Sequence, residues 1–309
     1  MRLVFLGTPA FAVPTLERMV EAGHEVLAVV TQPDRASGRG QQTAAPPVKV
    51  AALRLGLAVY QPERVRRPDA VEYLRNLAVD AMVVVGYGQI IPQSVIDLAP
   101  LGIINVHASL LPAYRGAGPI QWAILNGETR TGVTTMRIDA GLDTGDMLLK
   151  AETEIGAEQN AIELGRRLAA MGADLLVETL RGLEAGTIVP EKQDSALATY
   201  APLLKKEDGL IAWNQPAAAI HNRVRGLQPW PGAYTALRGS LLHIWKARPA
   251  AGSGTPGRIV SLRPLTVACG DGALELVEVQ MEGRKRMPAT DFANGHRLSE
   301  NDLLGEPTR

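Results

Sequence analysis

Two polar residues that could carry out chemistry, Asn105 and His107, interrupt an apolar run that begins at Gly102 and extends to Val106. A β-branched apolar run of this kind is typical of a strand buried on both faces. Because residues i and i+2 of a strand point to the same face, the two side chains should emerge together at the carboxyl end of the strand. An amide and an imidazole in this position can donate hydrogen bonds to an oxyanion in a tetrahedral intermediate.

A carboxylate could join them from Asp143, in the loop DAGLDTGDM between Gly141 and Gly145. These glycines permit positive φ and close backbone approach, which suits a loop that folds over a site. A carboxylate there can hold the orientation of the imidazole. Because no Ser or Cys elbow accompanies the three residues, direct acyl transfer to an amine is favoured over a covalent acyl-enzyme. The alternative is that Asn105 and His107 only satisfy backbone groups at a strand end.

The elements that must position these residues alternate between strand and helix. Strands are expected at residues 2–7, 25–31, 58–61, 81–86, 102–106 and 147–155, and helices at residues 11–22, 48–55, 69–77 and 160–183. This alternation predicts an α/β fold with a Rossmann-like, doubly wound, mostly parallel sheet. Ligands of such sheets bind beyond the carboxyl ends of the strands, where the strand order reverses. If strands 2–7 and 81–86 are neighbours, the strand order reverses between them. The ligand site is then expected beyond their carboxyl ends, beside the strand that ends at His107.

The turn after the first expected strand, GTPAFA, lacks the GxGxxG pattern that places a helix N-terminus on a pyrophosphate. A dinucleotide cofactor is therefore disfavoured. The strand at 81–86 instead continues into GYGQIIP, residues 86–92. Its glycines let the backbone approach a flat heterocycle, although the same sequence could be only a tight turn.

Residues 32–47 form a long segment with three prolines, two glycines, two arginines and no periodicity. A loop of this length inside a compact domain is usually functional or disordered. It could also be a mobile surface insertion without a role.

The last third of the sequence changes to short strands punctuated by Gly and Pro, which predicts a small β-barrel of the OB-like type. We therefore expect a catalytic domain at residues 1–189, a linker at 190–208 and a C-terminal β-barrel domain at 209–309. Residues 205–309 hold 14 Lys and Arg against 10 Asp and Glu, a weak indication of nucleic-acid contact. The tryptophans of this region could stack on bases, but such residues more often belong to the core: Trp213, Trp230 and Trp245.

The chain has 309 residues, 46% of them hydrophobic and 21% charged, with a formal net charge of zero. Its only cysteine, Cys269, excludes a disulfide within the chain and a Cys-based zinc site. No run approaches the length needed to span a bilayer, and the first apolar run is too short for a signal peptide. We expect a cytoplasmic protein without a membrane partner and without a metal.

Two segments carry a resemblance to a known family. NVHASLLPAYRGAGPIQWAI and GVTTMRIDAGLDTGDML are similar to the signature of formyltransferases that use 10-formyltetrahydrofolate. The family's catalytic Asn, His and Asp fall on Asn105, His107 and Asp143 without a gap. The resemblance further implies folate contacts from Gly86, Tyr87, Gly88, Gln89, Ile90, Ser109, Leu110, Leu111 and Pro112.

The segment PDRASGRG, within residues 32–47, looks like the loop with which some family members engage the acceptor end of tRNA. This resemblance assigns tRNA contacts to Arg35 and Arg39. Members often carry Lys-Lys after GRG, whereas this chain has Gln41 and Gln42, which lowers the positive charge of the loop.

The resemblance implies transfer of a formyl group from 10-formyltetrahydrofolate to the α-amino group of methionine on initiator methionyl-tRNA, for translation initiation. It also implies that the C-terminal domain binds the tRNA. Two other functions stay open. One is a formyltransferase for another amine, such as a sugar nucleotide or glycinamide ribonucleotide; the other is an RNA-binding protein that keeps the fold without the chemistry.

Overall fold

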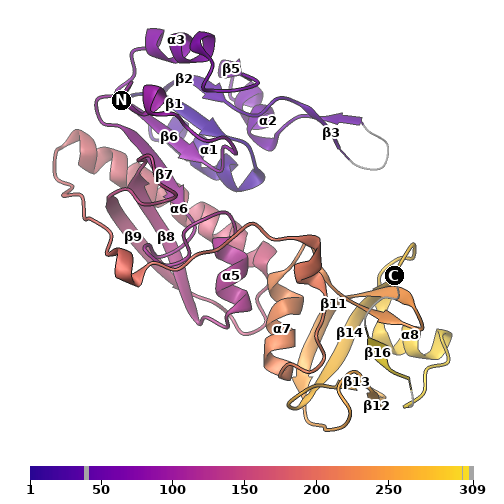
Figure 1. Cartoon of the computed structure of the whole chain (residues 1–309). Coiled ribbons are helices and arrows are strands. Elements are labelled where there is room, and N and C mark those ends of the chain that lie inside the picture. The colour runs from indigo at the N-terminus through magenta and orange to yellow at the C-terminus, as the bar shows by residue number, and fades with distance from the viewer. Residues whose placement is uncertain (38–41, 301, 306–309) are drawn as a thin grey trace. The chain divides into compact units, whose positions relative to one another are not determined.

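The computed structural model describes residues 1–37, 42–300 and 302–305. Its first sheet contains β1 (Arg2–Gly7), β2 (Glu25–Val30), β5 (Val59–Tyr60), β6 (Ala81–Val85), β7 (Ile103–His107), β8 (Arg130–Arg137) and β9 (Met147–Glu154). The short 3₁₀ turn η1 (Ala10–Ala12) precedes the helices α1 (Val13–Glu21), α2 (Pro47–Arg54), α3 (Pro68–Asn76), α4 (Gln93–Ile96), α5 (Pro119–Leu125) and α6 (Ala161–Glu184). Figure 1 shows these elements in colours from indigo through magenta to pink.

The strand order of this sheet is β5-β2-β1-β6-β7-β8-β9, and β1 pairs in parallel with both β2 and β6. The chain adds strands outward from β1 in one direction and from β6 in the other, so the order reverses between β1 and β6. The predicted adjacency of these two strands is confirmed. β7 pairs in parallel with β6 and antiparallel with β8, so the sheet is mostly parallel, as expected.

Helices pack on both faces of this sheet, because successive side chains of its strands enter different cores. Leu3 and Phe5 of β1 pack in a cluster with side chains of α1, α2 and α6. Val4 and Leu6 pack in a second cluster with side chains of α3 and α4. Near-continuous apolar strands are required for burial on both faces. The predicted Rossmann-like, doubly wound fold is confirmed.

The segment at residues 32–47 differs from its expectation, because it contains a short antiparallel hairpin. β3 (Arg35–Ser37) pairs with β4 (Gln42–Ala44). Strands of three residues are too short for an alternating pattern to be visible in the sequence. Arg39 and Gln41 lie outside the described residues.

Two 3₁₀ turns, η2 (Ser195–Leu197) and η3 (Lys206–Gly209), follow α6 and lead into the C-terminal part of the chain. It continues with α7 (Ala217–Gly226), β10 (Ala233–Leu237), β11 (Ser240–Ala250), β12 (Ile259–Leu262), β13 (Leu265–Ala268), β14 (Ala273–Met281), β15 (Met287–Pro288), α8 (Ala289–Gly295) and β16 (Leu304–Gly305). The antiparallel order is β12-β13-β14-β11-β10-β16, and β15 pairs with β14. A bridge from Arg258 to Leu303 joins the two ends of this order. The sheet therefore curls, as the predicted barrel requires.

The three tryptophans named above differ in environment. Trp213 is 5% exposed and its indole Nε1 donates to Thr235 Oγ1 at 3.0 Å, so it belongs to the core of the curled sheet. Trp245 is partly buried, and the guanidinium carbon of Arg286 lies 3.6 Å from its ring centroid. Trp230 is 54% exposed. The core interpretation therefore holds for Trp213, whereas Trp230 presents its ring to solvent.

Packing divides the chain into two compact units. One contains Met1–Pro119, Thr131–Thr153 and Gly165–Ala201, and the other contains Ile120–Arg130, Glu154–Leu164 and Pro202–Arg309. Arg225 of α7 illustrates why residues 154–164 belong to the second unit, since its Nη1 donates to the carbonyls of Gly156 and Gln159 at 3.1 and 2.9 Å. Within the described residues, no helix combines the length and apolar character that crossing a bilayer requires.

Candidate active site

Asn105 and His107 lie at the carboxyl end of β7, the position predicted from their spacing. They are 8% and 6% exposed. Ile104 and Val106 enter the core cluster with α1, α2 and α6, whereas Ile103 enters the opposite cluster, which contains Tyr87. By the alternation of a strand, Asn105 and His107 share the face of Ile103. The expected common orientation of the amide and the imidazole is therefore present.

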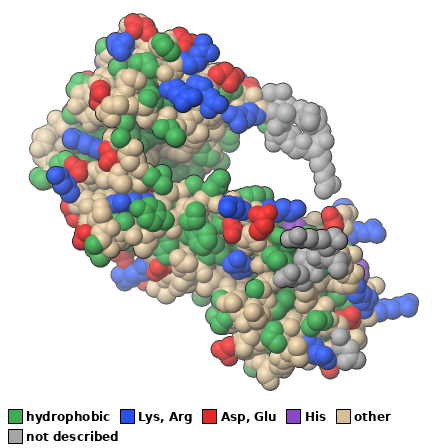
Figure 2. Space-filling view, viewed as in Figure 1, with side chains coloured by type: hydrophobic (Ala, Val, Ile, Leu, Met, Phe, Trp, Pro, Cys, Tyr) green, Lys and Arg blue, Asp and Glu red, His purple; other side chains and the backbone are tan. Residues whose placement is uncertain are grey.

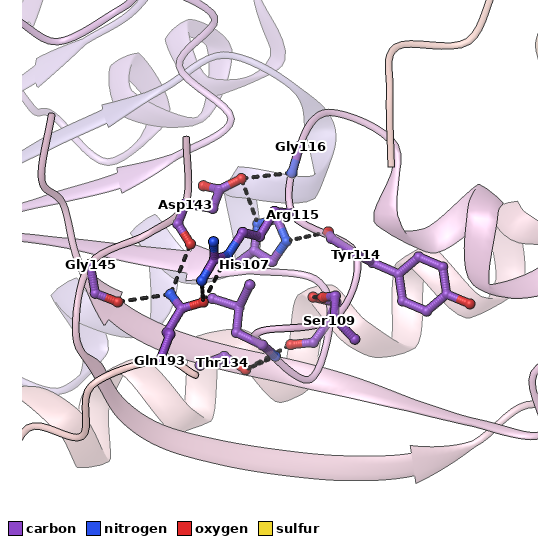
Figure 3. Close-up of polar contacts among 11 residues, drawn as sticks. His107, Ser109, Tyr114, Arg115, Gly116, Thr134, Asp143, Gly145 and Gln193 are labelled. Atoms are coloured by element: carbon purple, nitrogen blue, oxygen red, sulfur yellow. Dashed lines mark hydrogen bonds and ion pairs between the residues drawn. The ribbon is translucent and has the colours of Figure 1, made fainter. Parts of the chain in front are cut away.

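The imidazole of His107 is held from two sides (Figure 3). Its Nε2 lies 2.9 Å from the carbonyl oxygen of Tyr114, and its Nδ1 lies 3.7 Å from Asp143 Oδ2. A carbonyl oxygen only accepts hydrogen bonds, so Nε2 is the nitrogen that carries a proton in this contact. Nδ1 is consequently the ring atom that faces the carboxylate.

Asp143 reaches His107 from the loop between β8 and β9. Its Oδ2 accepts a hydrogen bond from the backbone N–H of Gly116 at 2.9 Å, and its backbone has a φ of 52°. Few non-glycine residues adopt this left-handed conformation, and those that do are concentrated at functional sites. The carboxylate is thus fixed by a backbone donor as well as by its own loop.

The glycines that flank Asp143 serve one of the two predicted purposes, close approach, but not the other. Neither Gly141 nor Gly145 has a positive φ; the positive φ falls on Asp143 itself. A Cβ at Gly145 would collide with the carbonyl oxygen of Arg137, and a Cβ at Gly141 would collide with the side chain of Thr144. The expectation of positive φ at the glycines is wrong. Glycine is required at these positions because neighbouring atoms lie too close for a Cβ.

The segment Ser109 to Pro112, predicted to contact folate, is a turn held by β8. Thr134 Oγ1 donates to the carbonyl of Ser109 at 2.7 Å and accepts from the N–H of Leu111 at 3.1 Å. Ser109 is fully buried, and Leu111 is 1% exposed and packs on Met136 and Met147. The side chains of Ser109 and Leu111 therefore build the turn, whereas Leu110 and Pro112 are partly exposed.

The second predicted folate segment follows β6. Gly86 and Gly88 have φ values of 56° and 83°, so this turn needs glycine at both positions. Tyr87 between them is 2% exposed, and burial raises the pKa of its phenol to about 12. Its carbonyl accepts hydrogen bonds from Thr8 Oγ1 at 2.9 Å and Gln32 Nε2 at 3.1 Å. Tyr87 therefore anchors the turn at the point where the strand order reverses.

The other two predicted folate contacts after β6, Gln89 and Ile90, have different surroundings. The side chain of Gln89 accepts a hydrogen bond from the N–H of Val65 at 2.8 Å and is thus engaged within the protein. Ile90 is 92% exposed. Of these two, Ile90 is the side chain available to an apolar ligand.

Of the two predicted tRNA contacts, Arg35 and Arg39, only Arg35 is among the described residues. Arg35 lies in β3, is exposed, and its Nη2 lies 3.4 Å from Gln32 Oε1. Because the carbonyl of Tyr87 accepts from the side chain of Gln32, the start of the hairpin is connected to the turn after β6. Arg39 lies outside the described residues.

Two residues near the site were not predicted from the sequence, Arg115 and Gln193. Arg115 is 3% exposed, and its Nε and Nη2 both donate to Gln193 Oε1, at 2.9 and 2.7 Å. Gln193 Nε2 in turn donates to the carbonyls of Asp143 and Gly145, each at 2.8 Å (Figure 3). Arg115 belongs to the quoted AYRGAG motif, but Gln193 lies 50 residues after Asp143 and carries no local signal.

Within the described ranges, no three His, Cys, Asp or Glu side chains are grouped as metal ligands would be. The imidazole of His107 faces the carboxylate of Asp143, and the amide of Asn105 lies two residues before His107 on the same face of β7. They can stabilise an oxyanion and accept a proton, which is the chemistry of acyl transfer to an amine.

Comparisons with known proteins agree with this geometry. Residues 1–180 match the family model described as "Formyl transferase", and residues 203–297 match "Formyl transferase, C-terminal domain". The chain is 76% identical to the methionyl-tRNA formyltransferase of Solibacter usitatus over 99% of each chain. It is 55% identical to the methionyl-tRNA formyltransferase of Citrifermentans bemidjiense, over 99% of this chain and 97% of the relative.

Solved structures with low identity share the fold. HypX from Aquifex aeolicus in complex with tetrahydrofolic acid matches with a TM-score of 0.66 and 19% identity, over 95% of this chain but only 47% of HypX. The N-formyltransferase from Helicobacter canadensis, solved with folinic acid and dTDP-3-aminofucose, matches with a TM-score of 0.65 and 18% identity. That match covers 92% of this chain and 99% of the other.

Proposed function

The chain belongs to the methionyl-tRNA formyltransferase family, and from this premise we propose that it formylates the α-amino group of methionine on initiator methionyl-tRNA. The formyl donor is 10-formyltetrahydrofolate, and the product serves translation initiation. The observation that carries the proposal is the contact of His107 with Asp143 at the end of β7, beside Asn105. We place the activity in the cytoplasm, without a membrane partner.

The first chemical step is attack of the methionine amine on the formyl carbon, which forms a C–N bond and places negative charge on the formyl oxygen. The amide N–H of Asn105 is one donor for this oxyanion. The ring of His107 protonated on both nitrogens is the other, because its Nε2–H donates to Tyr114 and its Nδ1–H, 3.7 Å from Asp143 Oδ2, is the remaining donor on the side of the reacting groups. Two fixed donors lower the barrier without reorganisation of solvent.

The proton of the amine is received by Asp143. An α-amino group has a pKa of about 7.7 to 8.0, so a fraction of it is neutral near pH 7 and attacks in that form; its nitrogen becomes acidic once the C–N bond has formed, and Asp143 then takes one proton. Collapse of the intermediate breaks the bond from the formyl carbon to N10 of the donor, which leaves with a proton. One proton is lost by the amine and one is gained by N10, so the carboxylate ends the cycle in its starting state.

The donor is proposed to lie against the turn after β6 and the turn from Ser109 to Pro112. Buried Tyr87 and Ser109 fix the backbones of these two turns. Exposed Ile90 offers an apolar surface to a flat heterocycle. Backbone groups next to an apolar side chain are the usual means of binding such a ring.

Recognition of the tRNA is assigned to the hairpin and to the C-terminal part of the chain. We keep the division into a catalytic domain at 1–189, a linker at 190–208 and a tRNA-binding domain at 209–309. On the face drawn in Figure 2, Lys and Arg side chains are interspersed with Asp and Glu side chains. RNA contact should therefore depend on local groups such as Arg35, Arg39, and Arg286 over Trp245.

The substrate assignment is tested by competition. The chain is incubated with 10-formyltetrahydrofolate and equal concentrations of initiator methionyl-tRNA, a dTDP-linked amino sugar and glycinamide ribonucleotide, and each acceptor is analysed by mass spectrometry. We expect one formyl group on methionine and unmodified small amines, with Asp143→Asn as the inactive control. Formylation of a small amine with unmodified tRNA would contradict the proposal, and binding of tRNA without any transfer would favour an RNA-binding protein.

A further inference from the structure

Part of the segment predicted as a linker, residues 190–208, lies along the catalytic residues. Glu191 and Met147 exchange two backbone hydrogen bonds of 2.8 Å. Further along, the N–H of Arg115 donates to the carbonyl of Thr199 at 2.8 Å, and the N–H of Ala201 donates to the carbonyl of Arg115 at 2.7 Å. The stretch between these two attachments is therefore fixed to the elements that carry His107 and Asp143.

Gln193 occupies this stretch, and its amide is engaged on both sides. The two N–H bonds of Nε2 go to the carbonyls of Asp143 and Gly145, and Oε1 accepts twice from Arg115. A hydrogen bond with a charged donor is stronger than a neutral one, and a guanidinium fork fixes direction as well as distance. Buried Arg115 thus leaves Gln193 a single orientation (Figure 3).

The two carbonyls that Gln193 holds belong to a strained residue, Asp143, and to the second residue after it, Gly145. Asp143 has a φ of 52°, and a non-glycine residue in this region persists only when its surroundings determine it. The Gly116 N–H holds the carboxylate of Asp143, and Gln193 holds the backbone carbonyls of Asp143 and Gly145. Without Gln193, the carboxylate keeps its contacts with Gly116 and His107, while the backbone that carries it can relax.

We propose that Gln193 is a positioning residue of the transfer reaction, which acts through Asp143, and that Arg115 fixes Gln193. This inference rests on the proposed function, because it concerns the carboxylate that receives the amine proton. A misplacement of about 1 Å at a reacting group can lower a rate by on the order of 10²-fold. We expect a loss of this size in kcat, with little change in the affinity for a folate analogue.

The test uses the full chain and near-isosteric variants. Gln193→Glu keeps an oxygen for Arg115 but replaces the two N–H donors by an oxygen that repels the carbonyls of Asp143 and Gly145. Gln193→Ala removes both functions, and Ser195→Ala, an exposed position of the same segment, is the control. kcat, KM for each substrate, the pH profile and the melting temperature are measured for all. We expect both Gln193 variants to lose kcat by on the order of 10²-fold, and Ser195→Ala to match the wild type.

A double-mutant cycle with Asp143→Asn separates positioning from general stability. If Gln193 acts through Asp143, Gln193→Ala should cost little further rate once Asp143→Asn is present. Full additivity, or a lowered melting temperature with wild-type kcat and pH profile, would overturn the inference. Wild-type kcat in Arg115→Lys would overturn the role of Arg115, because Lys lacks the fork. An inactive wild type would instead refute the proposed function, so the two failures are distinct.

Discussion

The Nε2 atom of His107 lies 2.9 Å from the carbonyl oxygen of Tyr114, seven residues further along the chain. This contact decides which ring nitrogen faces the reacting groups. Because the carbonyl cannot donate, the neutral imidazole must carry its proton on Nε2. Nδ1 is then the ring nitrogen that lies opposite Asp143 Oδ2, 3.7 Å away.

We therefore predict that neutral His107 is the Nε2–H tautomer. The measurement is the pair of imidazole ¹⁵N chemical shifts of His107, assigned by comparison with His107→Gln. In the neutral ring, the Nε2 shift should be that of a protonated nitrogen and the Nδ1 shift that of an unprotonated one. A neutral ring protonated on Nδ1 would rule out the orientation on which the proposed oxyanion contact depends.

A second prediction concerns Gly116, which has a φ of 116° and whose N–H holds the carboxylate of Asp143. A Cβ at this position would lie 2.7 Å from the carbonyl oxygen of Ala201. Gly186 is a matched control, because its φ is 66° but a Cβ added there would have no atom within 4 Å. Strain from φ alone costs about 1–2 kcal/mol, so Gly186→Ala should show that loss with normal kcat.

Gly116→Ala should lose more stability than Gly186→Ala and should also lower kcat, because the displaced backbone moves the donor to Asp143. Urea unfolding and steady-state kinetics on both variants provide the comparison. Equal losses of stability together with unchanged kcat would show that Gly116 does not hold the carboxylate.

The sequence predicts most of the first sheet and the three central site residues, for identifiable reasons. Strands such as β6 and β7 are apolar runs next to glycines, and burial on both faces requires that composition. Asn105 and His107 are two residues apart on one strand, so their common orientation follows from strand geometry. Asp143 is suggested by its glycine-flanked loop, and the resemblance to a family motif supports its assignment to the site.

Other features could not be predicted because their partners are distant in the sequence. Gln193 is 50 residues from the carbonyl of Asp143 and 78 residues from the side chain of Arg115, so no local pattern marks it. β8 contains three threonines, two of which face buried hydrogen-bond partners, and it therefore lacks the apolar run that identifies its neighbours. The positive φ of Asp143 is likewise imposed by contacts of the folded loop.

A third prediction concerns acid stability and His221 of α7. Burial lowers the pKa of this imidazole, and Glu158, whose Oε1 lies 3.7 Å from Nε2, opposes part of that effect. The folded state therefore binds fewer protons than the unfolded state as the pH falls below about 6.5. The contribution of His221 to stability is present above that pH and is lost as the pH falls toward its lowered pKa.

The melting temperature is measured at about pH 8 and at about pH 5.5, on either side of the ordinary histidine pKa. His221→Gln should lose fewer degrees between these two conditions than the wild type. His296→Gln, which changes an exposed histidine, should retain the wild-type difference. A loss in His221→Gln as large as in the wild type would mean that His221 does not contribute to acid sensitivity.

The central claim is that Asn105, His107 and Asp143 together carry out formyl transfer, and single-turnover kinetics tests it most directly. The rate of formyl transfer to initiator methionyl-tRNA is measured for Asn105→Ala, His107→Ala and Asp143→Asn, beside the affinity of each for a folate analogue. Loss of one oxyanion donor typically lowers a rate by on the order of 10²–10³-fold. We predict losses of that size in all three variants with nearly unchanged analogue affinity. Wild-type rates in the three variants, or rates that fall only in proportion to analogue affinity, would contradict the account.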